Sequence, residues 1–112
     1  MKDRAKSFAV RVIRLVEFLP QTRTADLLGK RLIECSTDMG VNYMASYKAK
    51  SPEDFVAKMA LVQEQAEQCV YWLELLVEAD LVDKSIATNL LGEANEIVNV
   101  AVSSLKTAKG KK

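Results

Sequence analysis

Residues 51–78 read SPEDFVAKMALVQEQAEQCVYWLELLVE, and this stretch decides the fold. Its apolar side chains recur at alternating steps of four and three: Phe55, Met59, Val62, Ala66, Cys69, Leu73 and Leu76. That spacing predicts one helix, roughly 40 Å long at about 1.5 Å per residue, with one apolar stripe. Ser51 can accept the free N–H groups of the first turn, and Pro52 suits the first helical position. Such a helix cannot bury its stripe alone, so further helices should surround it.

Three more amphipathic segments flank this helix, and we expect helices over residues 3–19, 25–47 and 84–107. Pro20 should end the first, Thr22 or Thr24 should cap the second, and Asp83 should cap the last. The expected stripes are Phe8, Val12, Leu15 and Leu19, then Leu28, Leu32, Cys35, Met39 and Asn42, then Ala87, Leu91, Ala94, Val98, Ala101 and Leu105, with a second stripe of Ile86, Leu90, Ile97 and Val100 on the last helix. Short connections between such helices predict an all-α, up-down-up-down four-helix bundle. Residues 1–112 should form one domain, with residues 106–112 as a frayed basic tail.

The middle of the second helix contains poor helix formers, which leaves two interpretations open. Ser36 and Gly40 lie four residues apart and would allow another helix to approach closely. Asn42 falls on the apolar stripe, where a buried amide could pair across the bundle and fix register and partner number. The alternative is a helix that breaks at Gly40. We favour the continuous helix.

Some apolar side chains lie off the main stripes and exceed what one bundle core uses. They are Leu61, Trp72 and Leu75 on the third helix and Val10 on the first. Apolar surface outside a core usually marks an interface. Together with Ser36, Gly40 and Asn42, the first three are therefore candidates for an oligomer interface or for close helix packing.

The composition argues against catalysis and against a bound metal or other cofactor. The chain has 112 residues and no histidine, the commonest general base and transition-metal ligand. Cys35 and Cys69 each fall on an apolar stripe and should be small buried core residues rather than a disulfide. Ser36 has no evident neighbouring base, so we expect no catalytic residue. No apolar run approaches the roughly 20 residues that span a bilayer, and no signal peptide is evident, so we expect a cytoplasmic protein without membrane contact.

Charge is unevenly distributed along a chain whose net charge is only +1. Residues 1–50 carry ten Lys or Arg and five Asp or Glu, whereas residues 51–105 carry two and ten. The third helix presents an acidic row of Glu64, Glu67, Glu74 and Glu78, which is either a solvated face or a partner for a basic helix. If the two chain ends meet at one end of the bundle, a basic nucleic-acid surface could form from Arg4, Arg11, Arg14, Lys106, Lys109, Lys111 and Lys112.

Several segments together resemble one known family. Residues 31–43, RLIECSTDMGVNY, look like its second-helix motif Ser-x-Ser-Ile-x-x-Asn, and residues 51–58, SPEDFVAK, look like the opening of its third helix. Residues 64–67 and 71–76, EQAE and YWLELL, are similar to the remainder of that helix. The family is the bacterial four-helix-bundle proteins first found encoded in intervening sequences of 23S ribosomal RNA genes. Two positions depart from the pattern, since Asp38 replaces the second serine and Ala45 stands where the family usually has an acid.

The resemblance implies a left-handed bundle that assembles into a ring, typically a homopentamer, without enzyme activity. It also implies a relation to accessory proteins of diversity-generating retroelements, which use a similar pentamer to bind a reverse transcriptase and nucleic acid. Our leading hypothesis is a non-enzymatic oligomeric interaction protein that contacts RNA or DNA through a basic surface. The alternative is a protein–protein adaptor in which the basic helix-one arginines meet the acidic row of the third helix.

Overall fold

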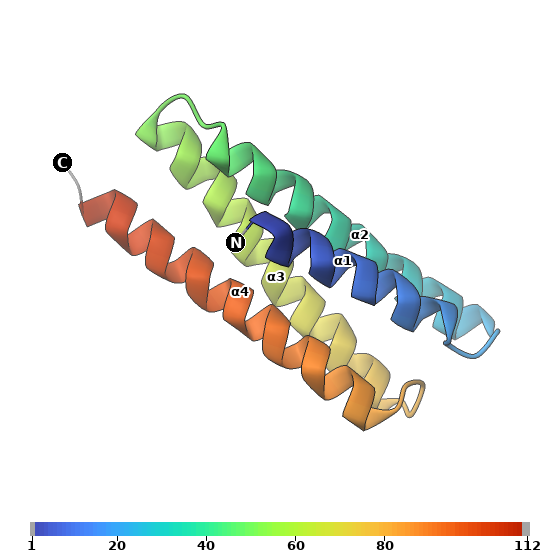
Figure 1. Ribbon diagram of the computed structural model, residues 1–112. Helices are drawn as coiled ribbons and strands as arrows, with labels where there is room; N and C mark the ends of the chain where they lie inside the picture. Colours follow the sequence, from blue (N-terminus) through green and yellow to red (C-terminus); the bar gives the residue numbers. More distant parts are fainter. Residues whose placement is uncertain (1, 111–112) are drawn as a thin grey trace.

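The computed structural model describes residues 2–110 and contains four α-helices: α1 Lys2–Glu17, α2 Arg23–Tyr47, α3 Pro52–Glu78 and α4 Lys84–Gly110. Consecutive helices run in opposite directions along an elongated bundle (Figure 1), whose extents are 50 × 20 × 19 Å. The all-α bundle predicted from the sequence is therefore confirmed. Its left-handed sense stays a prediction.

The helix boundaries follow from capping groups that the sequence supplies. The Thr22 hydroxyl accepts the Ala25 N–H at 3.1 Å, and the Ser51 hydroxyl accepts the Asp54 N–H at 3.0 Å. Asp83 accepts the Ser85 N–H at 2.9 Å at the start of α4. Each cap satisfies a backbone donor that has no partner inside its helix. Helix α1 ends at Glu17, earlier than expected, whereas α4 continues to Gly110, beyond the expected end at 107.

The buried stripes largely match the expected ones, with corrections in α2 and α4. The stripe of α2 passes through Met39 to the buried Tyr43, not to Asn42, which is only half-buried. The buried stripe of α4 combines members of both expected stripes, namely Ala87, Leu90, Ala94, Ile97, Ala101 and Leu105. The buried residues of both helices still recur mainly at steps of four and three, as they do in α3. What differs is the side of the helix that faces the core, because the apolar face of each helix is wider than one stripe.

Helix α2 is continuous through Gly40, as the sequence interpretation favoured. The close helix approach expected at Gly40 is absent, because a Cβ built there has no neighbour within 4 Å among the described residues. The close approach lies instead at Gly29, where a Cβ would come within 2.8 Å of a Val16 methyl group on α1. Gly29 thus lets α1 pack tightly on the first turns of α2, a role that the sequence analysis missed.

Helix α1 has 16 residues and α4 has 27, and this difference places the chain ends apart. The described chain begins near mid-height of the bundle, whereas α4 continues to one end (Figure 1). The expectation that both chain ends meet at one end of the bundle is therefore wrong. Along α4, the end that carries Lys106 and Lys109 is shared with the α2–α3 connection.

Candidate functional site

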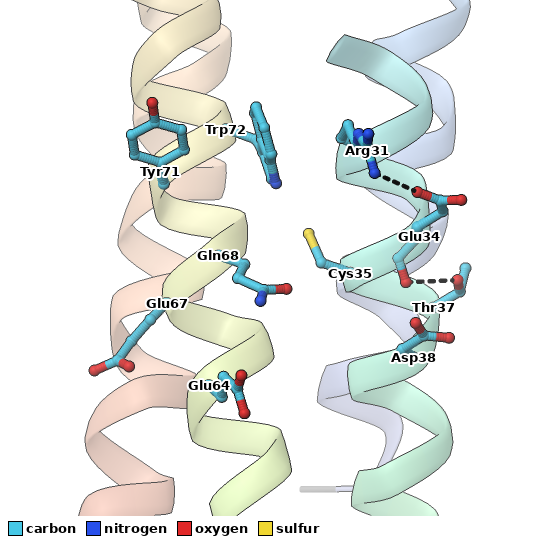
Figure 2. A pocket seen from close by; sticks show the side chains of 10 residues that line it. All are labelled: Arg31, Glu34, Cys35, Thr37, Asp38, Glu64, Glu67, Gln68, Tyr71 and Trp72. Carbon is cyan, nitrogen blue, oxygen red and sulfur yellow. Dashed lines mark hydrogen bonds and ion pairs between the residues drawn. The ribbon is translucent and has the colours of Figure 1, made fainter. Parts of the chain in front are cut away.

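A groove of about 830 Å³ lies between α2 and α3 on their outer side. Figure 2 shows its two walls facing each other across the gap between the helices. The lining residues are Arg31, Glu34, Cys35, Thr37 and Asp38 from α2, and Glu64, Glu67, Gln68, Tyr71 and Trp72 from α3. Two members of the predicted acidic row, Glu64 and Glu67, thus reach the groove, but Glu74 and Glu78 do not line it.

The groove is strongly acidic, because four carboxylates share it with one guanidinium. Arg31 lies 4.0 Å from Glu34 on its own helix, and this pair is exposed. Glu64, Glu67 and Asp38 have no ion-pair partner among the residues that the structure describes. The local potential is therefore negative, and it should attract cations and repel anions.

Cys35 lines the groove, and Cys69 lies buried next to it. Their sulfur atoms lie 3.1 Å apart, one from α2 and one from α3, and both are free thiols. The Cys35 thiol also donates to the Leu32 carbonyl oxygen at 3.4 Å. Both residues are buried as predicted, but the sequence analysis did not foresee that they meet. Their positions on facing stripes were the available signal, and the register between α2 and α3 was the missing information.

The thiol pair is electrostatically asymmetric. The hydrogen bond between the two thiols lowers the pKa of Cys35, with burial and the charge of Asp38 acting in the opposite direction. The same hydrogen bond, together with burial, raises the pKa of Cys69. Cys35 is therefore the thiol that more readily becomes a thiolate, which is the reactive form.

The candidate interface residues are divided between the core and the edge of this groove. Ser36 is buried, and its hydroxyl donates to the Ile33 carbonyl oxygen at 3.0 Å, so it packs inside the subunit. Asn42 donates to Gln65 of α3 at 3.1 Å, which bridges the two helices at the edge of the core. Gly40 is half-buried.

The off-stripe residues of α3 lie on the side of the helix that carries Gln65. Leu61, Gln65, Gln68, Trp72 and Leu75 follow one another at steps of four and three along that flank. Trp72 is half-buried against the core, with its ring edge against Tyr71 at a centroid distance of 5.1 Å. Leu75 is half-buried, and Leu61 is exposed. Their role in an oligomer stays a prediction.

The predicted basic surface is not assembled within one subunit. The Arg4 guanidinium contacts the carboxylates of Glu93 and Glu96 on α4, and the hydrogen bond to Glu93 raises the pKa of Arg4. The acidic partner of helix one is therefore α4, not the row on α3. Arg11 and Arg14 are exposed, and Arg14 borders the start of α4 beside Asp83. Lys106 lies roughly 30 Å further along α4 at about 1.5 Å per residue, so the two groups are separate.

A different cluster of cations forms at the end of the bundle where α4 finishes. Lys48 and Lys50 lie in the α2–α3 connection, and Lys106 and Lys109 lie in the last turns of α4. A groove lined by Pro52 and Ala108 joins these two segments. The four lysines are exposed, and none of them forms an ion pair with another described residue. We call these four residues the lysine end. Lys111 and Lys112, which were also predicted to contribute, lie outside the described residues.

The opposite end of the bundle carries an apolar patch. Phe18 is 90% exposed and Ile86 is 55% exposed, although both are large apolar side chains. They line a groove of about 370 Å³ together with Leu15, Leu81 and Val82. We call these five residues the Phe18 patch. The sequence analysis did not single it out, because Phe18 adjoins a predicted core residue and looked like part of a helix end.

Over residues 2–110, His, Cys, Asp and Glu side chains form no group of three or more that could hold a metal ion. Within the same residues, no helix combines the length and the apolar character that crossing a membrane requires. Both findings concern only the part of the chain that the structure describes.

Comparisons with known proteins match this chain to a protein family and to solved structures. The family model described as "23S rRNA-intervening sequence protein" matches residues 1–103. A crystal structure from Bacteroides thetaiotaomicron VPI-5482, described as a protein with unknown function from the S23 ribosomal protein family, is similar to this chain with a TM-score of 0.87 and 28% identity. The similarity covers 94% of this chain and 97% of that one. Among curated proteins, none matches this sequence.

Proposed function

The chain belongs to the 23S rRNA-intervening sequence protein family, and from this premise we propose that it is a non-enzymatic interaction protein that assembles with further copies of itself into a ring. A homopentamer is the assembly that the family resemblance implies. The observation that carries the proposal is the Phe18 patch, because an aromatic side chain with 90% of its surface exposed has no partner in its own subunit. Large apolar side chains gathered on a surface are typical of subunit interfaces.

Ring assembly has a geometric consequence for the charges. Cyclic symmetry repeats one heterologous contact around an axis, so the same end of every bundle lies at the same height. The lysine end of each subunit would then join a continuous basic belt. One subunit supplies only four described cations there, whereas a ring multiplies them.

Nucleic-acid binding by that belt is the second candidate function, and the unpaired state of Lys48, Lys50, Lys106 and Lys109 favours it. Each phosphate that a lysine neutralises releases condensed counterions, and this gain is independent of base sequence. The binding should therefore be micromolar or weaker, indifferent to sequence and steeply weakened by salt. The alternative is a protein adaptor that binds no nucleic acid, and the test must distinguish these two functions.

The test measures mass and RNA binding on the same preparation. Light scattering across a dilution series should give a mass several times that of the chain, and mixed-sequence single-stranded RNA should be retarded at low salt. Replacing Lys106 and Lys109 by Gln should reduce the slope of log affinity against log salt by about 1.4 for each subunit that contacts the RNA, since each contact to a single strand contributes about 0.7.

Lys6→Gln with Arg11→Gln is the matched control, because it removes the same charge from exposed residues of α1, outside the lysine end and outside the groove of the Phe18 patch. This control should leave the slope unchanged. An assembled parent protein that fails to retard RNA even at low salt would support the adaptor function. A monomer at all concentrations would contradict the proposal itself.

A further inference from the structure

The two cysteines beneath the acidic groove form a reactive arrangement that neither self-assembly nor nucleic-acid binding uses. We propose that Cys35 and Cys69 are a modification site, at which a neutral peroxide that enters the α2–α3 groove converts the dithiol into an intramolecular disulfide. The substrate class is small uncharged oxidants, with hydrogen peroxide as the simplest member. The product is a covalent link between α2 and α3.

The access to the two sulfur atoms differs, and this difference assigns their roles. Cys35 lines the groove and is 5% exposed, whereas Cys69 is 0% exposed and lies behind it. Figure 2 shows the Cys35 sulfur directed from α2 into the space between the two helices. An oxidant in the groove therefore meets Cys35 first, and Cys69 can react only with a sulfur that is already within contact distance.

The hydrogen bonds also indicate that Cys35 reacts before Cys69. The Cys69 thiol lies 3.1 Å from the Cys35 sulfur, and the Cys35 thiol has its own acceptor in the Leu32 carbonyl oxygen. Either thiol can donate in this pair, and once Cys35 has lost its proton the Cys69 thiol can donate to the Cys35 thiolate. Stabilising a thiolate beside a second thiol is the arrangement typical of reactive dithiols.

The reaction balances with peroxide as the only co-reactant. The Cys35 thiolate attacks one peroxide oxygen, so an S–O bond forms, the O–O bond breaks, and the departing hydroxide takes the former Cys35 proton as water. The Cys69 sulfur then attacks the Cys35 sulfur, so the S–S bond forms and the S–O bond breaks. The second hydroxide leaves with the Cys69 proton as a second water. The dithiol loses two electrons, and the peroxide gains them.

The two sulfur atoms need to move only a short distance to form the disulfide bond. The sulfur atoms lie 3.1 Å apart, and a disulfide bond is about 2.05 Å long, so they must approach by roughly 1 Å. The bond would join positions that are 34 residues apart across the α2–α3 hairpin. A link of this length restricts the unfolded chain, so the oxidised protein should unfold at higher denaturant concentration.

The carboxylates around the groove should select the oxidant by charge. The groove that leads to Cys35 is lined by Glu64 and Glu67 from α3 and by Glu34 and Asp38 from α2. Anionic thiol reagents are repelled there, whereas neutral and cationic ones are admitted. Cystamine and dithiodipropionate are alkyl disulfides of similar size and opposite charge, so the ratio of their rates with Cys35 measures this selection.

The first experiment treats the reduced full-length protein with hydrogen peroxide, unfolds it, alkylates the remaining thiols and measures the intact mass. We expect a loss of two hydrogens, no alkylation, a single chain on a non-reducing gel and full reversal by dithiothreitol. In Cys69→Ala, Cys35 should stop at the sulfenic acid, which dimedone traps. In Cys35→Ala, Cys69 should resist peroxide. Two free thiols after excess peroxide, disulfides between chains, or the reverse pattern in the variants would each overturn the proposal.

The second experiment does not depend on the folding of the alanine variants. On the parent protein, cystamine should consume Cys35 at least about tenfold faster than dithiodipropionate does, and high salt should reduce the ratio. Glu64→Gln with Glu67→Gln should lower the ratio, whereas the matched pair Glu53→Gln with Glu78→Gln, outside the groove, should not. Peptide mapping that finds Cys69 modified before Cys35, or an equal rate for both reagents, would contradict entry through the acidic groove.

Discussion

Phe8 within α1 and Phe18 in the turn directly after it offer a direct comparison of core and surface. Phe8 is 0% exposed and Phe18 is 90% exposed. If the Phe18 patch is a subunit contact, Phe18→Ala should weaken assembly and leave the fold of each subunit intact. Phe8→Ala should instead destabilise the fold of each subunit, because it removes a side chain that is buried in the core.

The size of the expected effect follows from the exposed surface. Burying a Phe side chain completely contributes about 1.5–3 kcal/mol, and nearly all of that surface is still available on Phe18. With about 1.4 kcal/mol per tenfold change in affinity, the dissociation constant at each contact should rise about 10- to 150-fold. Phe8→Ala should instead lower the free energy of unfolding by about 3–5 kcal/mol.

Sedimentation velocity over a concentration series measures the first effect, and urea unfolding measures the second. Leu27→Ala is a suitable control, because Leu27 is also an exposed apolar residue but lies on α2, outside the Phe18 patch. We expect the control to keep the assembly of the parent protein.

An unchanged dissociation constant for Phe18→Ala would refute the assignment of the interface to this patch. The same holds if Leu27→Ala weakens assembly equally, because exposure alone, and not position, would then explain the effect.

Three further substitutions follow from contacts within the subunit. Arg4→Gln removes the ion pair with Glu93, so it should lower the free energy of unfolding by about 1 kcal/mol and leave RNA binding unchanged in the retardation assay. Asn42→Leu loses only the bridge to Gln65 at the edge of the core, so light scattering should show the parent mass and unfolding should change by about 1 kcal/mol or less. A heterogeneous mass would instead support a role in partner number. Trp72→Ala should lower the free energy of unfolding, measured with urea, by about 2 kcal/mol, because the ring is half-buried against the core. If sedimentation shows a loss of assembly without this destabilisation, Trp72 is an interface residue instead.

The four helices were predictable because their determinants are local. The caps at Thr22 and Ser51 and the spacing of the α3 stripe depend on residues a few positions apart, and the structure agrees with them. The meeting of Cys35 with Cys69 and the pairing of Arg4 with Glu93 depend on how two helices slide along each other. That register results from side-chain packing over the whole interface, and the period of one helix does not contain it.

The separation of the predicted cations within one subunit follows from the length of α1. The sequence gives a plausible end for this helix at Pro20, but the 16-residue helix covers only part of the bundle beside the 27-residue α4. Arg4 therefore lies beside Glu93 in the middle of α4 and not beside Lys106. The α4 lysines share their end of the bundle with Lys48 and Lys50 of the α2–α3 connection.

The lysine end also has a purely structural explanation, in which the lysines neutralise negative charge at the same end of the bundle. A count of the charges shows how much positive charge is left over. Helices α2 and α4 both finish there, and each C-terminus carries about half a negative charge that nearby lysines neutralise. Glu53 and Asp54 in the first turn of α3 add two carboxylates at the same end. Four lysines still leave an excess of roughly one to two positive charges per subunit. Such an excess is too small for one subunit to hold a nucleic acid, so any binding to phosphate groups must depend on assembly, which places several lysine ends side by side.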